Sequence, residues 1–461
     1  MSQDDSFADR LRRRRFLRLS GALGATALAG CSSQEDLQGD GGDGGSSDGG
    51  SDGSSGDGSS GDGSSEDTEA ESDGESDGQS GGDPIDVGVT IPFSGDLSDF
   101  GEPMLNALQM AQEDINAAGG PLGREIRLHD EDTETNSTAG VNAANSLINT
   151  QNVSSIIGAV SSGVTISIAQ SVTIPNDTLH ITSASSSPTI SVLEDDDLVF
   201  RTRTNDRFVA KVMARVIQNQ GAESAAVLYI NNDFGAALAD TFEQTFEGTT
   251  TAKVGYESGQ SSYQQALSEL YADDPEYVAL AGYPESGTTI LSQWNEEGYG
   301  GNWVLHTSLL SQDFLSNVGG DVLEGMYGVR TKPPTGDATE AFVSDYEEAY
   351  PDSDLFSPYS WNSYDALVSY ALAVQHAGTT DSNAVKESMR KVSNSPGEAV
   401  SYAEFDSGKE MVEEGTTIDY AGPSGTVNYD DNGDVASDMV IVQVSDSEFQ
   451  DQETIPASEL I

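Results

Sequence analysis

From Pro84 onward, short apolar runs alternate with amphipathic segments, and this alternation restricts the chain to few architectures. The runs "IDVGVTI", "REIRL", "VSSIIGAV" and "TLHIT" have the length and composition of strands, and helical periodicity lies between them. A second series follows, with "AAVLYI", "YVALAGY" and "GNWVLHT" as strands. Strands that alternate with helices favour mostly parallel sheets with helices on both faces. The two series therefore predict two α/β lobes.

The first 31 of the 461 residues differ from this pattern and resemble an export signal. An arginine-rich stretch leads into an apolar run that is too short to span a bilayer. Within residues 1–31, "RRRFL" resembles a twin-arginine signal and "LAGC" resembles a lipobox. We therefore expect Cys31, the only cysteine, to be lipidated and to hold the protein on the extracellular face of the cell membrane.

Residues 32–83 consist almost entirely of Ser, Gly, Asp and Glu and contain no lysine or arginine. This composition cannot bury enough apolar surface to offset chain entropy, so we predict a disordered acidic tether. The acidity extends beyond the tether, since the net charge of the whole chain is −58. Such a charge argues against a nucleic-acid partner. We interpret it as adaptation to high salt, which screens the repulsion between surface carboxylates.

Loops rich in hydroxyl groups and glycine follow the expected strands. Five of them are "PFSGDLSDFG", "GAVSSG", "ITSASSSPT", "INNDFG" and "AGYPES". In parallel α/β sheets, ligands bind at the carboxyl ends of the strands. Backbone N–H groups and hydroxyls there can hold polar groups of a ligand, and aromatic rings can cover its apolar part. The pattern favours a binding site for a small molecule.

Signals for catalysis or for a metal are weak. The folded part has no GxSxG, P-loop, HExxH or CxxC motif. A hydrolase would have to combine Ser162 or Ser186 with His180 or His306, and no spacing commits either histidine to a serine. "NYDDNGDVASDM" starts like a calcium loop, but Met439 stands where a glutamate ligand belongs, which favours an Asn-Gly turn. We therefore expect no enzyme, no cofactor and no metal.

From about Asp86 to Val444 the sequence resembles the substrate-binding lipoproteins of branched-chain amino acid ABC transporters, which have the type I periplasmic-binding-protein fold. The resemblance lies in "VGVTIPFSGDLSDFGEPMLNALQMAQEDINAAGGPLGREIRL", "WNSYDALVSYALAV" and "GPSGTVNYDDNGD". It implies a ligand cleft between lobe 1, residues 84–203 and about 331–395, and lobe 2, residues 204–330 and about 396–461. It also implies that the cleft closes on a branched-chain amino acid or related polar ligand, with an ABC permease and its ATPase as partners.

Position by position, the resemblance implies ligand-binding residues in both lobes. They are Phe100, Ser161, Ser162, Ala184, Ser186, Phe234, Tyr283, Thr307 and Tyr359. Ser162 matches the serine that binds the amino acid, and Tyr283 matches a tyrosine near the ammonium group.

One departure from the family concerns the glutamate that pairs with the ligand ammonium. This glutamate would align near Thr307, where the chain has no acid. Because an unpaired buried ammonium is costly, either Glu285 or Asp313 substitutes, or the ligand is an amide, urea or an aromatic carboxylate. A ligand-binding sensory module at the cell surface remains the alternative to transport.

Overall fold

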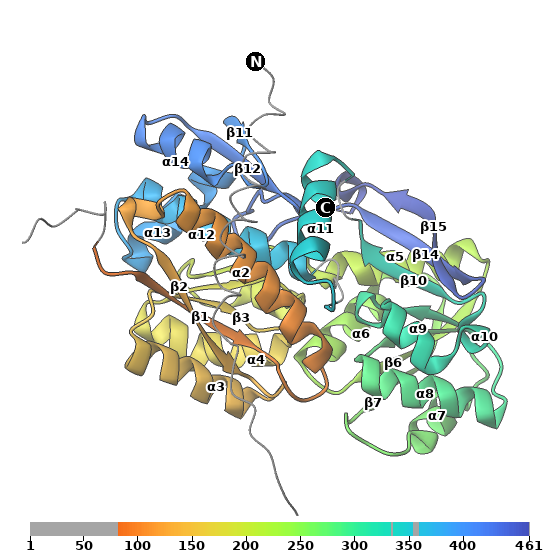
Figure 1. Ribbon diagram of the computed structural model, residues 1–461. Coiled ribbons are helices and arrows are strands. Elements are labelled where there is room, and N and C mark those ends of the chain that lie inside the picture. Colours follow the sequence, from red (N-terminus) through yellow and green to blue (C-terminus); the bar gives the residue numbers. More distant parts are fainter. Residues whose placement is uncertain (1–81, 333–334, 354–358, 461) are drawn as a thin grey trace, which may run out of the picture. The chain divides into compact units, whose positions relative to one another are not determined.

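The computed structural model describes residues 82–332, 335–353 and 359–460. The expected signal with Cys31, and the tether up to residue 81, lie outside the described residues. Two large sheets flanked by helices make up most of the described chain, as Figure 1 shows. Within these ranges, no helix is both long enough and apolar enough to cross a membrane.

The first sheet has five strands in the order β2-β1-β3-β4-β5, and all neighbours run parallel. Its strands are β1 (Ile85–Ile91), β2 (Ile126–Asp132), β3 (Ser155–Gly158), β4 (Leu179–Thr182) and β5 (Val199–Arg201). Its flanking helices include α2 (Gly101–Ala117), α3 (Ser137–Ser146), α4 (Ser162–Ile168), α12 (Tyr359–Ala377) and α13 (Ser382–Ser393). Helix α2 packs on α12, and α3 packs on α4. Strands β3 and β4 are buried along their whole length, including the polar residues Ser155, His180 and Thr182.

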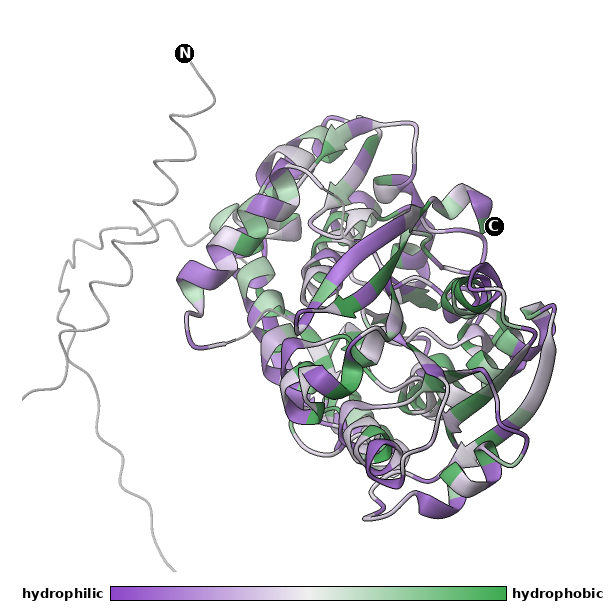
Figure 2. Cartoon of the chain, turned by 90° about the vertical axis from the view of Figure 1, so that its right-hand side faces the viewer, coloured by the Kyte–Doolittle hydropathy of each residue, from purple (hydrophilic) through white to green (hydrophobic). Residues whose placement is uncertain are grey.

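The second sheet has the order β15-β14-β10-β9-β8-β6-β7. Strands β6 (Ser224–Ile230), β7 (Thr249–Tyr256), β8 (Tyr277–Ala281), β9 (Asn302–Leu305) and β10 (Tyr327–Thr331) are parallel. The hairpin of β14 (Met439–Ser445) and β15 (Glu448–Ile455) adds two antiparallel strands. The helices are α5 (Asp206–Asn219), α6 (Asp233–Thr245), α7 (Gln264–Leu270), α8 (Pro284–Glu297), α9 (Gln312–Val318) and α10 (Gly320–Leu323). Figure 2 shows the hydrophilic β15 beside the hydrophobic β14, and a polar edge strand discourages pairing with other chains.

One boundary between the lobes lies later in the chain than the sequence suggested. We expected lobe 2 to include everything after about residue 396. Instead α14 (Phe405–Glu413) packs against α12, and β12 (Ile418–Gly422) packs against α12 and α13 of lobe 1. Strands β11 (Glu398–Val400) and β13 (Gly425–Thr426) pair with β12. The buried side chains of Phe405 and Ile418 explain this placement, because the helices of lobe 1 cover them. Of the chain after residue 396, only the part from β14 onward contributes strands to the second sheet.

The chain crosses between the lobes after β5, between β10 and α11 (Asp337–Ala349), and before β14. Arg201, which is completely buried, joins the first and third crossovers because its Nε and Nη2 donate to the two carboxylate oxygens of Asp434 at 2.5 and 2.8 Å. Burial alone would raise the pKa of Asp434, but the Arg201 charge and its hydrogen bonds lower it. Arg203 joins the first and second crossovers, since its Nη1 donates to Thr331 Oγ1. These contacts fix where the two sheets meet.

Candidate ligand-binding site

A small cavity lies between the lobes, at the carboxyl ends of the parallel strands. Its lining residues are Leu97, Phe100, Val160, Ser162, Ala184, Ser186 and Tyr359 from lobe 1, and Phe234, Tyr283, His306 and Ser308 from lobe 2. Seven of the nine residues expected from the sequence therefore come together. The cavity measures about 20 Å³, which is room for about one water molecule. A ligand of amino-acid size therefore requires the lobes to move apart.

Two of the expected residues, Ser161 and Thr307, do not line the cavity. Ser161 lies beside it and forms a hydrogen bond of 3.1 Å with the hydroxyl of Tyr283 in the other lobe. The Thr307 hydroxyl donates to the carbonyl of Val329 at 2.9 Å, so this side chain is turned toward β10. Because the chain makes a tight turn here, His306 and Ser308 line the cavity in place of Thr307.

Ser162 keeps a hydroxyl hydrogen available for a ligand. Its oxygen accepts the N–H groups of Ser186 and Ser187 at 3.3 and 3.2 Å. Among the described residues, no side chain or carbonyl accepts the Ser162 hydroxyl hydrogen. Ser186 differs, because its hydroxyl donates to Asp206 Oδ2 at 2.5 Å. Ser162 is therefore the better donor for a ligand oxygen, and Ser186 offers its lone pairs.

Asp206 is the acid of the site, and it is not among the residues expected from the sequence. It is completely buried at the start of α5 and contacts two residues of the cavity wall, Ser186 and His306, whose Nε2 lies 3.2 Å from its Oδ1. Burial alone would raise the pKa of Asp206, but His306, Arg203 and the Ser186 hydrogen bond lower it, so the carboxylate is ionised. The two acids that we considered, Glu285 and Asp313, are exposed and outside the cavity. The signal for Asp206 was "RTRTND", a charged stretch directly after a strand.

His306 acts as a hydrogen-bond donor to Asp206. Its Nδ1 accepts the backbone N–H of Ser308 at 3.1 Å, so the ring proton is on Nε2, which donates to the carboxylate. The Ser308 hydroxyl donates to the carbonyl of Gly282 at 2.6 Å. The oxygen of this hydroxyl also lies 2.8 Å from His306 Nδ1, so Ser308, His306 and Asp206 form one hydrogen-bonded chain beside the cavity.

The pairs considered for a hydrolase do not form in the described chain. Neither Ser162 nor Ser186 is hydrogen-bonded to a histidine. His180 lies inside β4, where its Nε2 is 2.8 Å from the Gly158 carbonyl, and burial lowers its pKa to about 4. The geometry gives neither Ser162 nor Ser186 an adjacent base.

Aromatic rings from both lobes form the apolar walls. Phe234 stacks on Tyr283 with ring centres 5.7 Å apart, and it meets His306 edge-on at 4.8 Å. In lobe 1, Phe100 packs edge-on against Tyr359 at 5.0 Å. Burial raises the pKa of Tyr283 to about 12, so its hydroxyl stays neutral. The site thus combines apolar walls with a few oriented polar groups, as small-molecule sites usually do.

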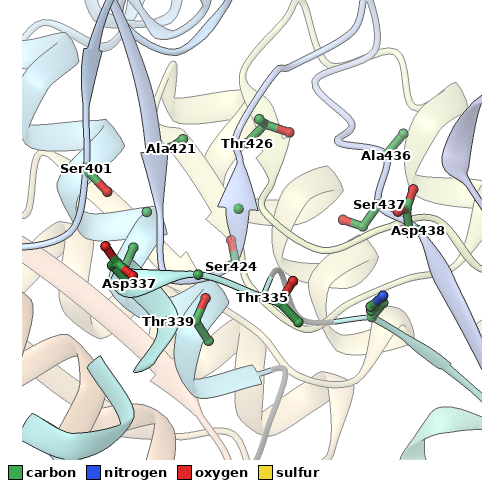
Figure 3. Close-up of a pocket in the computed structure, with 15 residues that line it drawn as sticks. Thr335, Asp337, Thr339, Ser401, Ala421, Ser424, Thr426, Ala436, Ser437 and Asp438 are labelled. Carbon is green, nitrogen blue, oxygen red and sulfur yellow. The ribbon is translucent and has the colours of Figure 1, made fainter. Parts of the chain in front are cut away.

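A second, wider cavity of about 780 Å³ lies where α11 and β14 begin. Figure 3 shows hydroxyl groups from Thr335, Thr339, Ser424, Thr426 and Ser437 around it. Its other lining residues are Lys332, Gly336, Asp337, Ala338, Ser401, Ala421, Gly422, Gly425, Ala436 and Asp438. No aromatic ring is among them, so nothing there would cover the apolar part of a ligand. The smaller cavity is the better candidate site.

The described residues hold no cluster of three or more His, Cys, Asp or Glu side chains placed for a metal ion. In the segment that starts like a calcium loop, Asp430 Oδ1 accepts the N–H groups of Asn432 and Asp434 at 2.8 and 3.0 Å. This carboxylate therefore stabilises a turn.

Two α/β lobes, three crossovers and a cavity at the strand ends between the lobes define a binding protein of the type I periplasmic class. The chain belongs to the periplasmic binding protein family, whose model matches residues 84–448. This match confirms the resemblance found in the sequence. The proteins of this family are substrate-binding proteins rather than enzymes.

Two curated relatives illustrate the family. One is the chemotactic signal transduction system substrate-binding protein BasB of Halobacterium salinarum, which is 26% identical over 382 residues, or 81% of this chain and 90% of that protein. Another is the Leu/Ile/Val-binding protein homolog 3 of Brucella melitensis, 26% identical over 314 residues, or 65% of this chain and 81% of that protein.

Solved structures confirm the expected fold. The leucine-binding protein LivK of Thermotoga maritima superposes with a TM-score of 0.69 at 24% identity, covering 81% of this chain and 99% of that chain. The branched-chain amino acid transporter protein LivJ of Streptococcus pneumoniae, in complex with isoleucine, has a TM-score of 0.67 at 19% identity, with coverage of 81% and 99%.

Proposed function

We propose that this protein captures a small amino-acid-like ligand between its lobes at the cell surface and delivers it to an ABC permease driven by a separate ATPase. The observation that carries the proposal is the cavity itself, where aromatic rings of both lobes surround the free hydroxyl hydrogen of Ser162. The relatives named for leucine, isoleucine and valine support a branched-chain amino acid or a related ligand. Lipid attachment at Cys31 would keep the protein near the permease.

The proposed mechanism assigns different tasks to the lobes. Lobe 1 receives the ligand first, with Ser162 donating to a ligand oxygen and Tyr359 and Phe100 covering its apolar part. Lobe 2 then closes, and the bonds from Ser161 to Tyr283 and from the Ser187 hydroxyl to the Asp233 carbonyl, both 3.1 Å, hold the lobes together. The ionised Asp206 is hydrogen-bonded to Ser186 and His306 of the cavity wall, so the electrostatic potential at this wall is negative. A negative potential favours a cationic nitrogen of the ligand at this position.

A second candidate function is chemotactic sensing, in which the same closure signals to a receptor. The similarity to BasB favours it. Deletion of the gene separates the two functions. Loss of labelled-ligand uptake supports transport, and loss of the swimming response with intact uptake supports sensing.

The binding proposal is tested with the purified protein in high salt. Mass spectrometry of the copurified small molecule identifies the ligand, and thermal shifts across amino acids and amides establish the affinity order. Ser162→Ala should abolish the shifts. The matched control is Ser167→Ala on the same helix, whose hydroxyl donates to the Gly163 carbonyl at 2.7 Å outside the cavity. Equal shifts in the Ser162→Ala and wild-type proteins would contradict the proposed site.

The surface location is tested separately with Cys31→Ser. This variant should be released into the medium instead of remaining with the membrane fraction. Membrane retention of the variant would argue against the lipid anchor.

A further inference from the structure

Arg203 is completely buried, and two of its three guanidinium nitrogens have no hydrogen-bond partner among the described residues. Its Nη1 donates to Thr331, whereas Nε and Nη2 meet no acceptor in the described part of the chain. Leaving buried charged donors unsatisfied is costly, and native structures usually avoid it. The two unpartnered nitrogens of Arg203 are therefore an unusual feature of a buried arginine.

Arg201, two residues earlier, shows how the Nε and Nη2 atoms of a guanidinium bind when an acceptor is present. Its Nε and Nη2 hold the carboxylate of Asp434 in a two-pronged contact at 2.5 and 2.8 Å. Arg203 leaves this same pair of nitrogens unpartnered within the described residues. The fold thus supplies a carboxylate for one arginine and leaves the matching edge of the other open.

Arg203 lies against the wall of the ligand cavity. Its guanidinium carbon is 5.4 Å from the centre of the Tyr359 ring, which lines the cavity beside Phe100. Asp206, which contacts the cavity residues Ser186 and His306, offsets part of the arginine charge but accepts no hydrogen bond from it. Arg203 does not line the closed cavity, and its guanidinium lies behind the aromatic end of the site. A ligand of amino-acid size that separates the lobes would bring its far end to this region.

We propose that the ligand carries a carboxylate that binds the Nε and Nη2 edge of Arg203 next to Tyr359. Two parallel N–H groups match a carboxylate in geometry and charge. This inference rests on the proposed function. If the α-carboxylate of an amino acid binds at Ser162, the second carboxylate belongs to its side chain. The ligand class is therefore a small dicarboxylate, with acidic amino acids as its simplest members.

The experiment compares four proteins with three amino acids. Isothermal titration of L-glutamate, L-glutamine and L-leucine is performed on the wild type, Arg203→Met, Arg203→Lys and a control, Arg207→Met. Arg207 also stacks on an aromatic ring, Phe208 at 4.6 Å, but it is only partly buried and is not in the cavity wall. The wild type should bind glutamate most tightly. Arg203→Met should weaken glutamate binding by about 10- to 100-fold and change leucine binding little.

The ratio of glutamate to leucine affinity separates a ligand-binding role from a structural one. Arg203→Met loses the bond to Thr331 and the charge that lowers the pKa of Asp206, so its melting temperature should fall, but a purely structural loss would weaken both ligands alike. Arg203→Lys keeps the charge without the two-pronged edge, and it should lose the preference for glutamate. An unchanged glutamate-to-leucine ratio in Arg203→Met would overturn the inference, whatever its melting temperature.

Other outcomes distinguish the two proposals. If leucine binds most tightly and the Arg203 variants bind it like the wild type, the inference fails and the proposed function stands. If glutamine binds more tightly than glutamate and the Arg203 variants lose this difference, the ligand group that accepts from Arg203 is an amide oxygen, and the proposed carboxylate is wrong. If no amino acid binds the wild type, the proposed amino-acid function fails, and the inference fails with it.

Discussion

Asp365 provides a quantitative test of the structure through the pH dependence of stability. It is completely buried in α12 and accepts hydrogen bonds from the Tyr420 hydroxyl at 2.6 Å and from the Ser424 N–H at 2.9 Å and hydroxyl. Burial raises the pKa of Asp365 to about 7, although these hydrogen bonds oppose the increase. The nearby Tyr364 and Tyr420 do not titrate near neutrality, because burial raises their pKa well above the ordinary value.

The direction and size of the effect follow from this raised pKa. An unfolded aspartate has a pKa of about 3.9, so the folded protein holds the proton more tightly. The resulting stability is fully present below about pH 4 and is lost as the pH rises to about 7. A difference of about 3 pKa units corresponds to about 4 kcal/mol, of which about 2 to 3 kcal/mol falls between pH 5 and pH 8.

Urea unfolding of wild type and Asp365→Asn in high salt, at several pH values from 5 to 8, measures this contribution. The asparagine cannot ionise, so the stability of the variant relative to wild type should increase by about 2 to 3 kcal/mol from pH 5 to pH 8. Taking the difference removes the effect of the many other carboxylates. Asp321→Asn, at an exposed position of α10, is the control, and the difference between its free energy of unfolding and that of wild type should not change with pH. If the stability difference between Asp365→Asn and wild type is also the same at every pH, the reasoning is refuted.

Three further substitutions test the crossovers and the site. Arg201→Met leaves Asp434 buried without its partner and should lower the free energy of unfolding by about 3 to 5 kcal/mol in urea titrations, and a second change, Asp434→Leu, should restore much of it. No rescue would argue against the ion pair as the cause. Tyr283→Phe removes the hydrogen bonds with Ser161 and Asn232, and ligand release in stopped-flow experiments should become about fivefold faster, as expected for about 1 kcal/mol. An unchanged release rate would mean that this contact does not hold the lobes closed. Asp206→Asn removes the charge behind Ser186 and His306 and should weaken binding of an amine-bearing ligand at least about tenfold in isothermal titration, whereas equal affinity would exclude an electrostatic role.

The sequence predicted much of the first sheet and the central strands of the second. Strands β1, β3, β4, β6, β8 and β9 lie where apolar runs indicated them. It did not predict the hairpin of β14 and β15, because β15 is mostly polar and owes its strand conformation to pairing with β14. It also placed α14 and β12 in the wrong lobe, since local periodicity does not indicate which helix will cover an apolar face.

For the site, the sequence identified the loops but not all the side chains. Ser162, Ser186, Phe234 and Tyr283 line the cavity because they follow parallel strands, whose carboxyl ends meet. Thr307 was expected and its neighbours His306 and Ser308 were missed, because the rotation of a single tight turn decides which of three adjacent residues line the cavity.

The sequence by itself therefore determined the class of fold, two parallel α/β lobes, and the loops that hold the site. These features depend on periodicities within a few residues, which can be read without the rest of the chain. Only the tertiary structure decided the charges at the site. His306 meets Asp206 across 100 residues, and Arg201 meets Asp434 across 233. Packing of distant segments supplies these partners, and it leaves the Nε and Nη2 edge of Arg203 without one in the described chain.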